Sequence, residues 1–176
     1  LRKLELPGNR KIGSLSRGQR GKLALLLALA FRPELLVLDD PVSGLDPIVR
    51  KEFLDQIIEL LQMEGRTVLF SSHILDEVER LADRVVIVDQ GRLLADSTLE
   101  DLKRRVKRVK FTFRDDPPGG NPPGLVNVTR NGRFVAGSLL DCTEQRLAEW
   151  QTIPGATIEV EDLDLNEIFV ECVKGG

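Results

Sequence analysis

The chain has 176 residues, of which 41% are hydrophobic and 30% charged, so it is long enough to bury a core and is typical of a globular protein. No apolar run approaches the roughly 18 residues that a membrane span requires, so a role at a membrane would come through a partner. The net charge of −3 gives no general affinity for nucleic acid, and we expect no nucleic-acid partner.

The first part of the chain alternates predicted helices and strands. Helices are expected at 19–30, from Asp46-Pro47 to about Gly65, and at 75–82; strands are expected at 35–38, 67–71, 84–89 and 92–95. Apolar strands separated by helices favour parallel pairing in a sheet that is covered on both faces. The pattern therefore predicts an α/β domain over residues 1–97.

Residues 98–176 predict a helix leading into a smaller α+β accessory domain. The helix is expected at 97–106 and a strand at 109–114, whereas the Pro- and Gly-rich segment 115–124 is predicted to be a loop or linker. Strands at 125–129 and 133–138 follow, joined around Asn131-Gly132, a strong hairpin signal. A helix at 144–150, a strand at 157–160 and a helix at 166–173 complete this part.

Three further features bear on location and partners. Cys142 and Cys172 are too few and too far apart for a disulfide framework, so we expect a reducing compartment. The sequence begins at Leu1 without a signal-peptide pattern, and we expect that it is truncated at its N-terminus. A local basic run is interpreted as a solvated helix end, and it comprises Lys103, Arg104, Arg105, Lys107, Arg108 and Lys110.

Two carboxylates, Asp39 and Asp40, directly follow the apolar strand at 35–38. Because the carboxyl ends of parallel strands form the ligand crevice of such sheets, acids at this point are placed to hold a metal ion or to activate water. Taken alone, the same residues also fit an ordinary strand followed by an Asp-Pro turn.

The segment Leu15-Ser16-Arg17-Gly18-Gln19 directly precedes a predicted helix. Ser16 and Gly18 supply a hydroxyl and an unobstructed backbone at the positive end of that helix, where anions bind. The alternative interpretation is a serine that only caps the helix.

Four segments, in this order and spacing, resemble the motifs of the ABC ATPase family. Residues 15–19 are similar to the signature, 35–40 to the Walker B strand, 43–46 to the D-loop and Ser72-His73 to the H-switch. The resemblance implies part of a P-loop NTPase sheet with flanking helices over residues 1 to about 100. The segment 164–169 is similar, more weakly, to the C-terminal extension of ATPases in the drug, polysaccharide and lipid export branch.

The resemblance implies ATP and Mg²⁺ as ligands and a role for each motif. Asp39 would hold Mg²⁺, Asp40 would be the catalytic base, and His73 would contact the γ-phosphate. Ser16 and Gly18 would contact the nucleotide held by a second subunit, and Asp46 would link the two sites. The full set of expected nucleotide-binding residues is Ser16, Arg17, Gly18, Gln19 and Asp46.

The same resemblance implies partners and a location. A second ATPase subunit would complete a homodimer or heterodimer, and an integral-membrane permease would carry the exported substrate. The protein would be cytoplasmic and peripheral on the inner face of the cell membrane, bound there through the permease.

The sequence departs from the family pattern in three places. Asp40 stands where the family usually has glutamate, which withdraws the carboxylate by about 1.5 Å. Arg17 stands where glycine is common. No Gly-x-x-x-x-Gly-Lys-Ser/Thr motif, the Walker A loop that cradles phosphates, occurs in the sequence. The 176 residues are therefore expected to bind ATP weakly and to be inactive alone.

Two other functions share some of these motifs. A degenerate, non-hydrolysing binding module would explain Asp40 and the missing phosphate cradle. A chromosome-maintenance or DNA-repair ATPase would share the signature and Walker B strand, but those proteins carry long coiled coils, and the sequence has no heptad run. The D-loop followed by a histidine switch favours the transporter branch.

Overall fold

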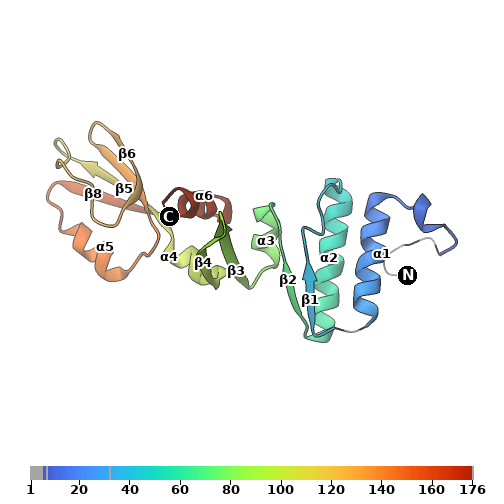
Figure 1. The fold of residues 1–176 in the computed structure, drawn as a ribbon. Helices are drawn as coiled ribbons and strands as arrows, with labels where there is room; N and C mark the ends of the chain where they lie inside the picture. Colours follow the sequence, from blue (N-terminus) through green and yellow to red (C-terminus); the bar gives the residue numbers. More distant parts are fainter. Residues whose placement is uncertain (1–5, 7, 32, 176) are drawn as a thin grey trace. The chain divides into compact units, whose positions relative to one another are not determined.

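The computed structural model of the protein describes residues 6, 8–31 and 33–175. Its helices and strands are shown in Figure 1, and they fall into two compact units, residues 1–74 and 75–176. Residues 1–5, 7 and 32, which belong to the predicted α/β domain, lie outside the described residues. In the described part of the chain, no helix has the length and apolar character that crossing a bilayer requires.

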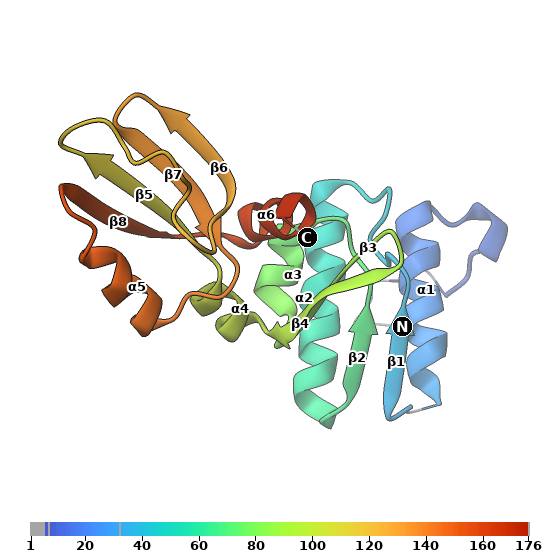
Figure 2. The ribbon, with the colours of Figure 1, turned by 60° about the vertical axis from the view of Figure 1, so that its left-hand side comes forward.

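The first unit consists of a short parallel sheet and two long helices. A 3-10 turn, η1 (Ile12–Ser14), is followed by α1 (Arg17–Ala30), β1 (Leu35–Leu38), α2 (Pro47–Glu64) and β2 (Thr67–Phe70). The two strands pair in parallel, with Leu35 opposite Thr67 and Leu38 opposite Phe70. The helices α1 and α2 of this unit are drawn beside the two strands in Figures 1 and 2.

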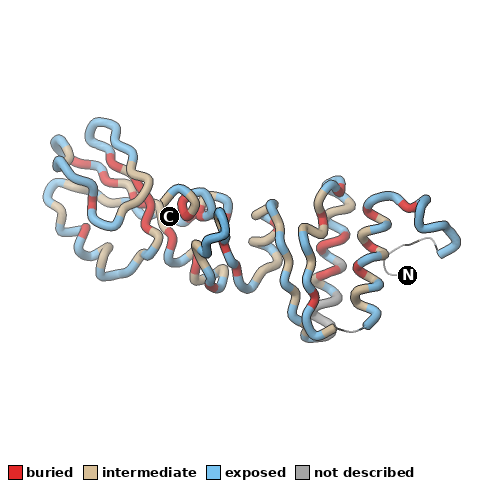
Figure 3. Tube along the Cα trace, in the orientation of Figure 1, coloured by how far each residue is buried: buried red, intermediate tan, exposed pale blue. Residues whose placement is uncertain are grey.

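Burial alternates along these strands because successive side chains point to opposite faces. Leu36 is buried, as are Phe53 and Leu54 of α2. On the other face of the sheet Leu35, Val37 and Leu69 are 55%, 63% and 57% exposed. Figure 3 draws buried residues in red and exposed ones in pale blue along the chain. Among the described residues, the helices of this unit cover one face of the sheet, and cover on the other face stays a prediction.

The second unit begins with a helix and an antiparallel hairpin. α3 (Leu75–Leu81) leads to β3 (Arg84–Asp89) and β4 (Arg92–Thr98), which pair antiparallel, and α4 (Leu99–Arg105) follows. Gln90 and Gly91 form the turn with φ of 46° and 76°, the positive values that two-residue hairpin turns require. Thr98 caps α4, because its hydroxyl accepts a 3.1 Å hydrogen bond from the Asp101 amide.

A four-stranded antiparallel sheet forms the rest of this unit, with the order β6-β7-β5-β8 (Figure 2). Its elements in chain order are β5 (Lys107–Phe113), β6 (Val126–Asn131), β7 (Phe134–Leu139), α5 (Glu144–Gln151), β8 (Ala156–Asp162) and α6 (Leu165–Gly175). Phe111 and Trp150 are buried in its core, with ring centroids 5.2 Å apart in an edge-on contact. The predicted mixture of α/β elements followed by an α+β part is thus confirmed.

The hairpin β3–β4 packs with the second unit. Val85 and Ile87 of β3 share one buried core with residues of α4 and α6, the whole set being Val85, Ile87, Leu102, Val106, Leu163, Leu165, Ile168 and Cys172. The structural division therefore falls between residues 74 and 75, whereas the sequence predicted a boundary at 97/98. As a boundary of the ATPase domain, the division into 1–97 and 98–176 stays a prediction.

The Pro- and Gly-rich segment 115–124 connects β5 to β6 inside the four-stranded sheet. The Arg130 guanidinium holds it, donating hydrogen bonds to the carbonyls of Pro118 (3.2 Å) and Gly120 and to the side-chain oxygen of Asn121 (3.2 Å). We call this arrangement the Arg130 clasp. The segment is a fastened loop of the second unit and not a linker between the two units.

The basic run predicted to be a solvated helix end is a series of ion pairs. Each of its six members contacts a carboxylate, the pairs being Lys103–Glu79, Arg104–Asp101, Arg105–Asp141, Lys107–Asp162, Arg108 with Glu167 and Glu171, and Lys110–Glu161. Its positive charge is therefore matched locally by acids of the second unit.

Candidate functional site

The candidate site lies at the carboxyl ends of β1 and β2. Asp39 and Asp40 follow β1, while Ser71 and His73 follow β2, and the parallel pairing brings all four together. The Ser71 hydroxyl donates to Asp39 Oδ1 at 2.6 Å and accepts from the Asp40 amide at 2.8 Å. His73 Nδ1 lies 3.0 Å from Asp40 Oδ2. We call these four residues the acidic cluster.

Asp40 has an unusual backbone and an unpartnered oxygen. Its φ of 42° is in the left-handed region, which aspartate tolerates better than most residues. Its Oδ2 faces His73, whereas Oδ1 is buried and makes no hydrogen bond in the described structure. A buried acceptor without a donor is costly, so Oδ1 is suited to receive one from a bound ligand or water.

The acidic cluster fits Mg²⁺ only as part of a larger ligand set. Carboxylate oxygens are the donors that Mg²⁺ prefers, and Asp39 and Asp40 supply two carboxylates in the acidic cluster. Among the residues that the structure describes, no group of three or more acidic, histidine or cysteine side chains could hold a metal ion by itself. This suits Mg²⁺, which is commonly bound through one or two carboxylates together with substrate phosphates and water.

The predicted signature residues form the start of α1. The Ser16 hydroxyl accepts from the Gln19 amide at 3.2 Å, and Gln19 Oε1 accepts from the Ser16 amide at 3.0 Å, which makes a complete capping box. Ser16 and Arg17 are exposed, whereas Gly18 is buried. The functional and capping interpretations of Ser16 are therefore both compatible with its position.

The predicted D-loop lies beside the signature in the same chain. A methyl group on Gly18 would come within 2.8 Å of Val49 Cγ1, and one on Gly44 within 2.6 Å of the Arg17 guanidinium. Gly44 also has a φ of 67°. Asp46 caps α2, because its Oδ1 accepts from the amides of Ile48 and Val49, both at 3.1 Å. The close packing against Val49 favours glycine at position 18, whereas the positive φ favours it at position 44, since the Arg17 side chain can move aside.

The predicted site residues thus form two groups. Asp39, Asp40 and His73 meet in the acidic cluster, whereas Ser16 to Gln19 and Asp46 lie where α1 and α2 begin; in the described chain, no hydrogen bond joins the groups. The sequence reasoning missed Ser71. A polar residue at the end of the strand next to the acids was the available signal, but its contact depends on strand register.

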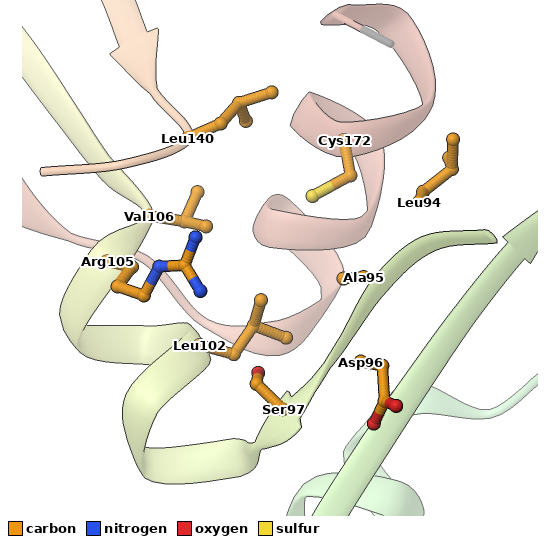
Figure 4. Close-up of a pocket in the computed structure, with 9 residues that line it drawn as sticks. All are labelled: Leu94, Ala95, Asp96, Ser97, Leu102, Arg105, Val106, Leu140 and Cys172. Atoms are coloured by element: carbon orange, nitrogen blue, oxygen red, sulfur yellow. The ribbon is translucent and has the colours of Figure 1, made fainter.

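The second unit contains a small pocket, drawn in Figure 4, of about 230 Å³. Its lining is mostly apolar and comprises Leu94, Ala95, Asp96, Ser97, Leu102, Arg105, Val106, Leu140 and Cys172. Arg105 is already paired with Asp141, and burial raises the pKa of the Cys172 thiol, which keeps it protonated and unreactive. The pocket is smaller than the roughly 300 Å³ at which ligand sites begin.

Comparison with protein families and solved structures agrees with the motifs. Residues 5–79 match the family model described as "AAA domain, putative AbiEii toxin, Type IV TA system". The ATP-binding cassette MJ0796, solved as a dimer in a post-hydrolysis state with ADP and Pi, is 25% identical with a TM-score of 0.50; the match covers 56% of this chain and 43% of that one.

Curated relatives match along most of the chain. The daunorubicin resistance ATP-binding protein DrrA3 of Streptomyces coeruleorubidus is 32% identical over 93% of this chain and 55% of its own length. The Nod factor export ATP-binding protein I of Neorhizobium galegae is 36% identical over 95% of this chain and 49% of its own. The uncharacterized ABC transporter ATP-binding protein YdbJ of Bacillus subtilis is 47% identical over 56% of this chain.

The fold and the four motifs resemble those of the ABC-type ATPases. Along most of its length, the chain is similar to part of the ATP-binding proteins of ABC transporters, as the sequence predicted. The chain spans about half the length of the two relatives that match almost all of it: 55% of DrrA3 and 49% of the Nod factor export protein.

Proposed function

We propose that the chain is part of an ATPase subunit that hydrolyses ATP to power export through a separate membrane permease. The observation that carries the proposal is the acidic cluster, in which Asp40 presents one buried, unpartnered oxygen beside a histidine. Two relatives that match almost the whole chain are named for drug resistance and for Nod factor export, which supports export as the process. A cytoplasmic position beneath the permease, as part of an ATPase dimer, completes the proposal.

The chemistry follows from the position of each side chain. Asp40 accepts the proton of the attacking water, and His73, 3.0 Å away, orients the Asp40 carboxylate and reaches toward the γ-phosphate. Asp39 contributes an oxygen ligand to Mg²⁺, which when bound neutralises charge on the phosphates. At the start of α1, the Ser16 hydroxyl and the backbone of Gly18 bind the phosphate of a nucleotide held by a second subunit.

The test is the ATPase rate of the complete native polypeptide. Asp40→Asn keeps the side-chain shape but cannot accept a proton, so turnover should fall by about 100-fold or more while ATP binding is retained. Asp83→Asn, an exposed carboxylate outside the acidic cluster, is the matched control and should turn over normally. An Asp40→Asn protein with the wild-type rate would show that Asp40 is not the base.

One other function has an observation in its favour. Asp40 is shorter than the glutamate that the family usually carries at this position. A shortened catalytic side chain favours a binding module that does not hydrolyse ATP. A wild-type protein that binds ATP and Mg²⁺ with no turnover would establish that function and contradict the proposed hydrolysis.

A further inference from the structure

Ser71 stands between the two acids of the acidic cluster. It is the first residue after β2, and its amide continues the strand pairing by donating to the Leu38 carbonyl at 2.9 Å. This bond places its side chain directly beside the two residues that follow β1. The hydroxyl then bonds to Asp39 Oδ1 at 2.6 Å and to the Asp40 amide at 2.8 Å.

The direction of these two bonds is fixed by chemistry. An amide can only donate, so the Ser71 oxygen accepts from Asp40, and its own proton is free to point to the Asp39 carboxylate. One hydroxyl therefore fixes the rotamer of Asp39 and the backbone of Asp40 at once. Charge-assisted hydrogen bonds of this length are among the stronger ones in proteins.

The backbone of Asp40 needs such a partner. Aspartate tolerates its φ of 42° better than most residues do, but the conformation is still uncommon for a residue with a side chain and persists only where its surroundings hold it. The bond from the Asp40 amide to Ser71 is one restraint of this kind, and the contact of its carboxylate with His73 is another.

We infer that Ser71 is a positioning residue, which orients Asp39 toward the metal and fixes the backbone of Asp40 in the geometry that the reaction requires. The inference deepens the proposed ATPase function and rests on it. Because Ser71 acts on a metal ligand through a hydrogen bond, its loss should weaken divalent-metal affinity as well as turnover.

Mn²⁺ binding in the complete native polypeptide tests the inference. Free Mn²⁺ is followed by electron paramagnetic resonance during a titration in the presence of a non-hydrolysable ATP analogue. Ser71→Ala should weaken Mn²⁺ binding by about 10-fold, the lower end of the effect that lost second-shell partners have. Ser71→Thr keeps the hydroxyl and suits a strand end, so its affinity should stay within about two-fold of wild type.

Thr152→Ala is the control, because the Thr152 hydroxyl lies outside every motif and donates to the Glu149 carbonyl, 2.6 Å away, at the end of α5. It should leave Mn²⁺ affinity within about two-fold of wild type. Wild-type Mn²⁺ affinity in Ser71→Ala, or equal loss in Ser71→Ala and Ser71→Thr, would overturn the inference while leaving the ATPase proposal intact. A wild-type protein that binds Mn²⁺ with the analogue, loses affinity on Ser71→Ala and yet shows no ATP turnover would contradict only the proposed hydrolysis.

Discussion

At the scale of single residues, the backbone of Asp40 sets what can replace it. Its φ of 42° is tolerated by aspartate and asparagine, whereas for other residues with a side chain this conformation is roughly 1–2 kcal/mol less favourable. A glutamate restores the longer carboxylate of the family but has no such tolerance. The structure therefore offers a physical reason for aspartate at this position.

Asp40→Glu should for this reason keep or raise catalytic activity but lower the free energy of unfolding by about 1 kcal/mol. Asp40→Asn should stay within about 0.5 kcal/mol of wild type, since asparagine accepts a positive φ equally well. Urea denaturation near neutral pH measures both. Equal stability of the glutamate and asparagine variants would show that the backbone conformation of Asp40 carries no strain.

The residues also show where sequence reasoning ends. Asp39, Asp40 and His73 could be predicted to meet, because motif order and parallel pairing place them at one edge of the sheet. Ser71 could not, since its role depends on the exact register that sets Leu38 opposite Phe70. The positive φ of Asp40 likewise has no signature in composition or periodicity.

At the scale of elements, α6 is fastened to the four-stranded sheet by a charged network. Arg108 of β5 donates to Glu167 at 2.9 Å and to Glu171 at 3.1 Å, and Asn127 of β6 donates to the Glu171 carboxylate at 2.6 Å. Burial would raise the pKa of Glu171, but the hydrogen bonds from Asn127, Arg108 and Ser138 outweigh it, and the pKa lies below its usual value.

This network makes the second unit sensitive to acid. The folded pKa of Glu171 is below the ordinary value of 4.5. Its contribution to the free energy of unfolding is therefore complete above pH 4.5 and is lost as the pH falls through the folded pKa. When the pH falls from about 6 to about 3, the free energy of unfolding should therefore decrease less for Glu171→Gln than for wild type. Glu159→Gln, an exposed residue of β8, is the control and should follow wild type. Identical acid sensitivity in Glu171→Gln would contradict this account.

Element boundaries were largely predictable, and packing was not. The strands at 35–38 and 84–89 match β1 and β3, because apolar runs bounded by turn residues define them. α1 begins at Arg17, two residues before the predicted Gln19, because the side chains of Ser16 and Gln19 cap it. The packing of β3 with α6 in one core brings together residues about 80 positions apart in the sequence, and no local sequence pattern predicts such a contact.

At the scale of the whole molecule, the two groups of site residues suggest a shared site. In the dimer that we propose, Ser16 serves the nucleotide of the partner subunit, whereas Asp40 serves that of its own. Ser16→Arg and Asp40→Asn homodimers would then each be defective at both sites. A heterodimer of the two variants contains one intact site, formed by Asp40 of the first chain and Ser16 of the second.

We therefore expect the differently tagged, full-length heterodimer to recover a substantial part of one site's ATPase rate. Ser16→Arg also removes the cap of α1, which costs about 1 kcal/mol, so folding and nucleotide-dependent dimerisation are checked in parallel. A heterodimer that closes normally yet is as inactive as both homodimers would argue against the shared site.

The Arg130 clasp has a practical consequence for dissecting the molecule. Segment 115–124 has the composition at which one would choose to cut the chain or to insert a reporter peptide, but Arg130 ties its carbonyls to β6. Proteases cleave segments that can unfold locally, so a loop held by hydrogen bonds should be cleaved more slowly. Severing the chain there would also part β5 from β6 within one sheet, so neither piece would contain the whole second unit. The junction between residues 74 and 75, where the compact units divide, is the better place to separate the two halves of this protein.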